Sequence, residues 1–159
     1  MGKRDDLSQL SRRFKQFHRI YLIDPNGRGG TATKVRRFLT VSASVGNSMT
    51  LTQDATNGDS IAINKTGLYA ISYSDSLTTG SAGEGFGISL NAGGSGTTDY
   101  SALTDAQRMA SGGVNTAGVA DGVSWVGLLS AGDSLRAHLS GTAGDTTTYL
   151  TRFSMIRLF

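Results

Sequence analysis

The sequence between residues 61 and 73 reads Ile-Ala-Ile-Asn-Lys-Thr-Gly-Leu-Tyr-Ala-Ile-Ser-Tyr. Three polar residues in its middle lead into Gly67, which can turn the chain without a steric penalty. The alternation after this glycine predicts a strand with Tyr69, Ile71 and Tyr73 on one face. Because two aromatic side chains and an isoleucine on one face require burial, we expect this strand at the centre of a β-sandwich.

From residue 34 onwards, short apolar runs alternate with clusters of Gly, Ser, Thr and Asn, a pattern typical of many strands joined by turns. Glycine supplies 22 of the 159 residues and charged residues only 17%, so small polar side chains must cover much of the surface. The stretch 91–122 is irregular and is expected to be a loop-rich crossover, where recognition often resides. Strands are predicted over 35–45 (with a possible interruption near Arg36-Arg37), 49–53, 60–63, 68–73, 86–90, 123–129, 135–139 and 149–159.

Three motifs resemble, in order and spacing, those of the complement globular-head and tumour-necrosis-factor-like jelly rolls. They are Ile61 with Gly67, Tyr69, Ile71 and Tyr73; Gly132-Asp133 between the run 125–129 and Leu135; and the closing segment 149–159 with Phe153-Ser154. The resemblance covers residues 34–159 and implies a ten-strand jelly roll that trimerises about its own axis for binding and assembly. The residues expected in the core or at the subunit interface are Tyr69, Ile71, Tyr73, Trp125, Phe153 and Phe159.

The first 30 residues differ in charge from the rest and are expected to form a separate basic attachment arm before a sandwich over 31–159. Residues 1–40 contain ten Lys and Arg against three Asp, whereas residues 41–159 contain five against nine acidic residues. Asp6 with Gln9 resembles a capping box, and apolar residues at steps of three and four predict an amphipathic helix that ends before the turn 24–27. The residues expected to bind a partner are the apolar Leu7, Leu10, Phe14, Phe17 and Tyr21 and the basic Arg12, Arg13, Lys15 and Arg19.

Such a helix could form a collar beneath a trimeric head, insert into a partner or pack against its own sandwich. Its charge is too sparse for a dedicated nucleic-acid or membrane site, so neither partner is expected. The sequence has no cysteine, no signal peptide and no run long enough to cross a membrane, so we expect synthesis in a cytoplasm and no disulfide framework.

No catalytic constellation is visible, and we expect no enzyme, cofactor or metal. The two histidines, His18 and His138, have no Gly-x-Ser-x-Gly motif beside them, and His138 is expected on the polar face of its strand. Nine carboxylates beyond residue 50 are scattered singly, mostly beside small residues, where they typically close turns. The glycine run 80–87 lacks the Lys-Ser/Thr ending of a phosphate loop.

The sequence therefore predicts an all-β jelly-roll sandwich with a short N-terminal amphipathic helix. The functional hypothesis is a homotrimeric bacteriophage decoration protein on the outer surface of the virion, made in the host cytoplasm. In that hypothesis, residues 1–30 dock on the major capsid protein or another virion protein. The alternative is the receptor-binding head of a tail or head fibre, which would use the stretch 91–122 and could bind a host-surface glycan.

Overall fold

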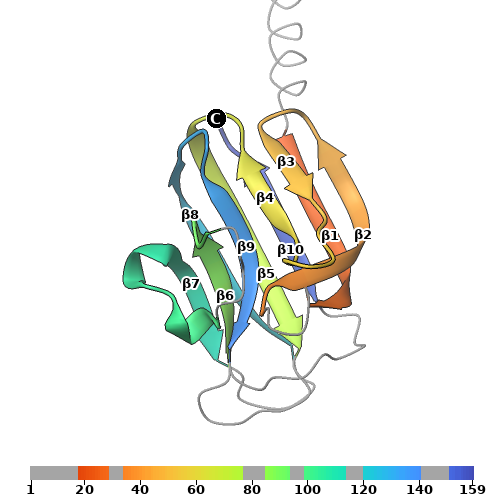
Figure 1. Cartoon of the computed structure of the whole chain (residues 1–159). Helices are drawn as coiled ribbons and strands as arrows, with labels where there is room; N and C mark the ends of the chain where they lie inside the picture. The colour runs from red at the N-terminus through yellow and green to blue at the C-terminus, as the bar shows by residue number, and fades with distance from the viewer. Residues whose placement is uncertain (1–17, 29–33, 77–84, 94–98, 114–119, 141–150) are drawn as a thin grey trace, which may run out of the picture.

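The computed structural model describes residues 18–28, 34–76, 85–93, 99–113, 120–140 and 151–159. Within these residues, ten strands form two antiparallel sheets that pack face to face (Figure 1). The strands are β1 His18–Arg28, β2 Arg36–Val45, β3 Met49–Thr52, β4 Ser60–Ile63, β5 Gly67–Ser76, β6 Gly85–Leu90, β7 Arg108–Gly113, β8 Ala120–Leu129, β9 Ser134–Ser140 and β10 Arg152–Arg157. Two short 3-10 turns, η1 Tyr100–Ala102 and η2 Asp105–Gln107, precede β7.

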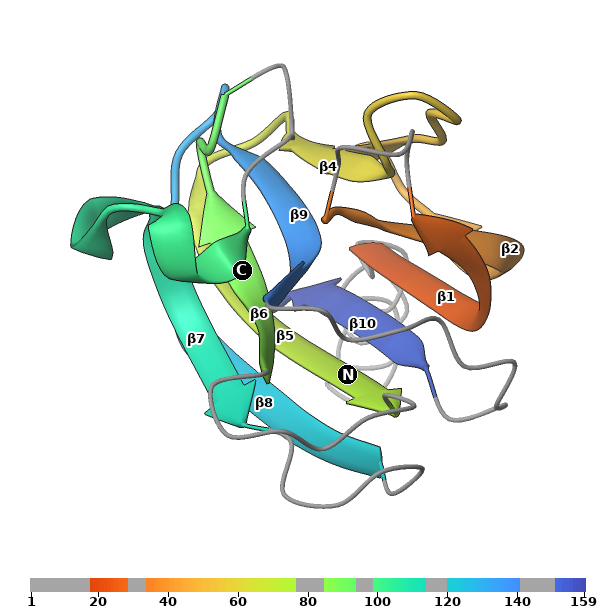
Figure 2. The same cartoon turned by 60° about the horizontal axis from the view of Figure 1, so that its bottom comes forward.

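The two sheets have five strands each and follow jelly-roll order. We call the sheet β2-β1-β10-β5-β8 sheet I and the sheet β3-β4-β9-β6-β7 sheet II. Figure 2 shows β1, β10, β5 and β8 side by side in one layer, with β9 and β6 in the other. The prediction of an all-β jelly-roll sandwich is confirmed, and the strand predicted from the central sequence motif, β5, lies between β10 and β8.

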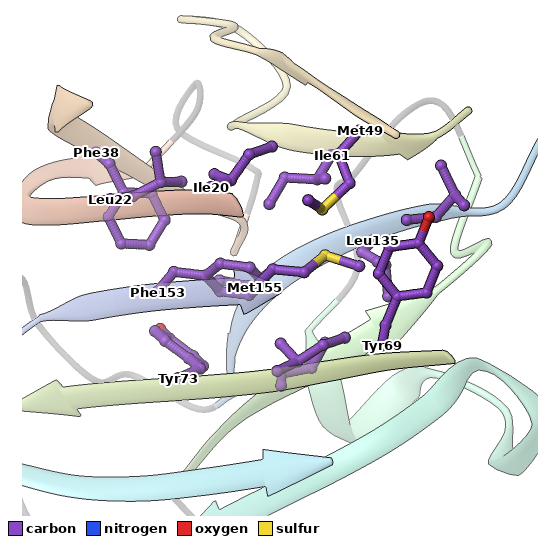
Figure 3. Packing of buried hydrophobic residues seen from close by; sticks show 14 of the residues in the cluster. Ile20, Leu22, Phe38, Met49, Ile61, Tyr69, Tyr73, Leu135, Phe153 and Met155 are labelled. Carbon is purple, nitrogen blue, oxygen red and sulfur yellow. The ribbon is translucent and has the colours of Figure 1, made fainter. Parts of the chain in front are cut away.

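The core fills the space between the sheets with the inward faces of alternating strands. Tyr69, Ile71 and Tyr73 on β5 are all buried, as the alternation predicts. Phe153 on β10 lies beside Tyr73, and the ring of Tyr73 meets that of Phe86 on sheet II edge-on, with centroids 5.2 Å apart. Figure 3 shows these β5 and β10 side chains meeting residues of the neighbouring strands in one apolar layer.

The predicted N-terminal helix is wrong from His18 onwards, because residues 18–28 form strand β1; residues 1–17 lie outside the described part. Ile20 and Leu22 point into the core, while Arg19 and Tyr21 face outward. This period of two is typical of a strand and is hidden in the sequence by the three-and-four spacing of the apolar residues. Pairing with β2 on one side and β10 on the other then decides the conformation. The turn predicted at 24–27 is part of β1, whose pairing with β2 shifts register there.

Two further expectations about the sandwich are corrected. The strand beginning at Arg36 runs to Val45 without an interruption. The stretch 91–122 is not only a crossover, since it contains η1, η2, strand β7 and the start of β8. The sequence of β7 shows no apolar alternation that would predict a strand, because Ser111, Gly112 and Gly113 are small. Its backbone pairing with β6 makes it a strand.

The part of the outer face of sheet II over β6 and β9 is covered by the chain itself. The Tyr100 ring lies directly over Gly87, where an added Cβ would be 2.3 Å from the ring, and the Tyr100 hydroxyl donates to the Ala110 carbonyl at 2.7 Å. His138 is fully buried beneath this cover, near Tyr100 on one side and paired with Val35 on the other. The expectation that His138 lies at the surface, exposed or at an interface, is therefore wrong, because segments distant in sequence bury this residue within its own chain.

Candidate oligomerisation face

The outer face of sheet I differs from that of sheet II, because apolar side chains on it stay exposed. The strand registers arrange its outward-facing residues in rows across the five strands, since the residues between them point into the core. One row contains Val45, Arg19, Ile156, Ala70 and Val126, and the next contains Ala43, Tyr21, Ser154, Ser72 and Ser124.

One end of this face is apolar. Beyond the first row, Leu68 pairs with Leu128, and the Leu158 amide donates to the Leu68 carbonyl at 2.8 Å. Leu128 exposes 76% of its surface and the C-terminal Phe159 77%. Val126 and Leu158 are also exposed, and we call the four exposed residues Val126, Leu128, Leu158 and Phe159 the apolar patch. A clustered apolar surface of this kind marks a site of interaction with another molecule.

The middle of the face is polar. A shallow hollow of about 360 Å³ lies over β10, β5 and β8, and Tyr21 and Arg152 contribute to its lining. The remaining polar lining consists of hydroxyls from Ser72, Ser74, Ser124 and Ser154. Hydroxyls and one guanidinium can bind water or polar groups of a partner, but this lining holds no carboxylate or imidazole that could act as a general base.

The two outer strands of sheet I carry different apolar residues. Strand β8 has ten residues paired only with β5 within the described chain, and it exposes Val126 and Leu128. Strand β2, at the opposite edge, exposes Leu39, Val41 and Val45. Long apolar edge strands are normally covered. Because the two edges of sheet I differ, they suit a head-to-tail interface, in which one edge of a copy contacts a different surface of the next, rather than a two-fold symmetric interface.

The predicted interface residues divide between the core and this face. Tyr69, Ile71, Tyr73 and Phe153 are buried in the sandwich of their own chain, and Phe159 is exposed on the apolar patch. Trp125 also faces inward and is half-buried, with its indole over Gly127.

Of the predicted arm residues, two are described, and both are on β1. Arg19 and Tyr21 lie on the outer face of sheet I, with the guanidinium 4.8 Å from the ring centroid. The other predicted arm residues lie outside the described part: Leu7, Leu10, Arg12, Arg13, Phe14, Lys15 and Phe17.

The exposed residues Val126, Leu128 and Leu158 were not predicted as site residues. A usable signal was present in β8, where apolar residues occupy both faces over 125–129. A strand that is apolar on both faces must be covered on both faces. Only the structure shows that the described chain leaves the second face of β8 open.

A second polar cluster lies inside the sandwich. Asp75 accepts from Arg36 Nε at 2.7 Å and from Nη2 at 2.9 Å, and the Thr151 hydroxyl donates to the same carboxylate at 2.7 Å. The Tyr73 hydroxyl also donates to Asp75, and burial together with the Asp75 charge raises the pKa of Tyr73 well above its ordinary range. The cluster is structural, since all four side chains are buried.

The expectation that the scattered carboxylates close turns holds for Asp54, which accepts from the amides of Thr56 and Asn57. It fails for Asp75, which forms the buried ion pair with Arg36. Across the described residues, no group of three or more His, Cys, Asp or Glu side chains is placed to hold a metal ion. The same residues include no helix of the length and apolar character needed to cross a membrane.

Comparison with known proteins places the fold. No protein-family model and no curated protein matches the sequence. Among solved structures, murine APRIL at pH 8.0 superposes with a TM-score of 0.59 at 13% identity, over 89% of this chain and 99% of that one. Eiger TNF from S. frugiperda superposes with a TM-score of 0.55 at 14% identity, over 91% of this chain and 94% of that one. The chain therefore has the jelly-roll fold of tumour-necrosis-factor-family proteins.

Proposed function

We propose that this chain forms a homotrimer through the outer face of sheet I and acts as a binding and assembly module without enzymatic activity. The observation that carries the proposal is the apolar patch around Leu128 and Phe159, which no described segment of the chain covers. Because β2 and β8 differ, contact between the β8 edge of one copy and the sheet I face of the next is heterologous and can close into a ring. The jelly-roll fold favours a ring of three.

The ends of the sandwich support an attached module. His18, where the described residues begin, pairs with Arg157 near the C-terminus, so the first and last described residues lie at one end of sheet I (Figure 1). Ser76 and Ala120 pair at the opposite end. In a cyclic trimer, three N-terminal arms would therefore leave from one end and leave the other end free for recognition.

Within this frame, we propose that the protein decorates the outer surface of a bacteriophage virion. The sequence of residues 1–17 contains both basic and apolar residues, so this arm would bind an acidic, partly apolar surface of the major capsid protein or another virion protein. The head would face solvent. Support for this step comes from the charge split in the sequence and from the position of His18 at one end of the sandwich.

A fibre-tip receptor-binding head is the second candidate, and one observation favours it. A hollow of about 410 Å³ on the sheet II side is lined by Tyr100, Arg108, Ser101, Ser111 and neighbouring residues, a composition suited to a polar ligand such as a host-surface glycan. Labelling on intact particles separates the two functions, since a decoration protein covers the shell and a fibre head sits only at fibre tips.

The test of assembly is the native mass of the full-length protein by light scattering. We expect three times the chain mass of 16.6 kDa for the wild type. Leu128→Lys should give a folded monomer, because a charge would then face an apolar interface. Ala62→Lys is the matched control: Ala62 is also exposed but lies on the outer face of β4 in sheet II, so this variant should remain a trimer. A monomeric wild type, or a trimeric Leu128→Lys, contradicts the proposal.

A further inference from the structure

The His18 ring holds the turn between β2 and β3. Its Nδ1 accepts hydrogen bonds from the backbone amides of Asn47 at 2.9 Å and Ser48 at 3.1 Å. Gly46 lies against the same ring with φ +82°, and an added Cβ would be 2.0 Å from Nδ1. The ring is only 9% exposed, so these contacts are made in a closely packed site.

Only neutral imidazole can make this arrangement. A nitrogen that accepts two amide hydrogens carries no proton, whereas both nitrogens of imidazolium are donors. Protonation of His18 would therefore direct an N–H group at the amides of Asn47 and Ser48 and break both hydrogen bonds. Because an N–H group and two amide N–H groups cannot face one another at hydrogen-bond distance, the turn or the ring must move.

The charged neighbours also oppose protonation. Lys65, in the turn before β5, and Arg157, on β10, are both cationic, and the turn at residues 46–48 contributes no titratable side chain. The Tyr69 hydroxyl donates to the Lys65 carbonyl at 2.6 Å and ties that turn to β5. Burial first, and then the charges of Lys65 and Arg157, lower the pKa of His18 below its ordinary value.

His18 is also the first residue of β1 and lies opposite Arg157 on β10, at the point where residues 1–17 join the sandwich. We propose that His18 is an acid-sensitive latch, whose protonation opens the turn at residues 46–48 and loosens the root of the N-terminal arm. The latch depends only on the contacts around His18; its use in controlling attachment rests on the proposed function of the arm.

The direction of the pH dependence of stability follows from the difference between the His18 pKa in the folded and in the unfolded chain. The unfolded chain protonates His18 near its ordinary pKa of about 6.5, whereas the folded chain does so at a lower pH. The stabilising effect of the latch is therefore complete above about pH 6.5 and is lost as the pH falls from there through the lowered pKa. Acidification releases the latch, and neutral pH closes it.

The experiment is an NMR titration of the full-length protein, following both histidine rings and the exchange of backbone amides corrected for intrinsic pH dependence. We expect a His18 midpoint below about 6.5. At that midpoint, exchange of the Asn47 and Ser48 amides should accelerate by about tenfold or more, together with the first amides of β1. The Gly58 amide, which donates to the Asp54 carbonyl in the turn at the other end of β3, should not change.

His18→Asn supplies the matched variant, because its amide oxygen can accept at the position of Nδ1 but cannot be protonated in this range. It should keep the turn amides protected at every pH. A His18 midpoint at or above about 6.5, unchanged turn amides, or a turn that opens while β1 stays protected would each overturn the proposal. The titration of the wild-type protein alone gives each of these results, so the test holds even if the variant does not fold. Light scattering on the same samples tests the trimer separately.

Discussion

At the scale of single residues, the buried pair of Arg36 and Asp75 is the most demanding feature of the sandwich. Both side chains are fully buried, and taking two ions out of water costs several kcal/mol each unless their hydrogen bonds are satisfied. Two Arg36 nitrogens and the Tyr73 and Thr151 hydroxyls satisfy the carboxylate. The cluster joins the start of β2, the end of β5 and the residue before β10, so it fixes one end of sheet I.

Removing one charge of this pair should be costly. We expect Asp75→Asn to lower the free energy of unfolding by about 3–5 kcal/mol, because Arg36 would then be a buried charge without its counterion. Asp121→Asn is the control, since Asp121 lies opposite Asp75 on β8 but is exposed; its effect should stay within about 0.5 kcal/mol. Urea denaturation measures both, and equal effects would contradict the structural role of the pair.

At the scale of elements, β1 limits how many N-terminal residues can be removed without disrupting the sandwich. It lies between β2 and β10, and its residues Ile20 and Leu22 are almost completely buried. Loss of β1 would remove two core side chains, worth about 1.5–3 kcal/mol each in burial, and would leave β2 without its only partner in sheet I. A boundary after residue 30 would therefore divide the sandwich, and any removable arm must end before His18.

Two truncations test this boundary. Deletion of residues 1–24 should abolish the cooperative thermal transition seen by circular dichroism, because β1 and its core residues are removed. Deletion of residues 1–17 should leave that transition in place, since every described strand remains. A cooperative fold in the longer deletion would show that sheet I does not need β1.

At the scale of the whole molecule, the two outer faces of the sandwich differ in how far other parts of the chain cover them. Tyr100 covers sheet II over Gly87 and His138, whereas the apolar end of sheet I is exposed. In the proposed trimer, copies would assemble through sheet I while sheet II faces outward.

The decoration hypothesis predicts that assembly and attachment can be separated. The protein without residues 1–17 should keep the trimer mass but lose binding to purified virions in a co-sedimentation assay, because the basic and apolar arm residues are absent. The Ala62→Lys variant, which keeps the arm, should sediment with particles as the wild type does. Full binding by the truncated protein would locate the attachment site in the sandwich.

Much of the architecture could be predicted because strand alternation is a local property. The spacing of Tyr69, Ile71 and Tyr73 required a buried central strand, and β4 begins and ends at the predicted residues Ser60 and Ile63. Burial of one face follows from the side-chain period of two, whichever strands lie alongside. The same reasoning identified the strands at 123–129 and 135–139 and the closing strand around Phe153. It did not identify their partners, since 123–129 and 135–139 do not form a hairpin: β8 pairs with β5 in sheet I, and β9 pairs with β4 and β6 in sheet II.

The tertiary structure alone decided the conformation of β1, the burial of His138 and Arg36, and the location of the open apolar face. Each depends on contacts between segments far apart in sequence: β1 with β10, His138 with Val35 and Tyr100, and Arg36 with Asp75. Local patterns cannot report such contacts, because a polar residue on an outer face becomes buried only when a distant segment covers it. The exposed face of sheet I follows for the same reason, since no described segment returns to cover it.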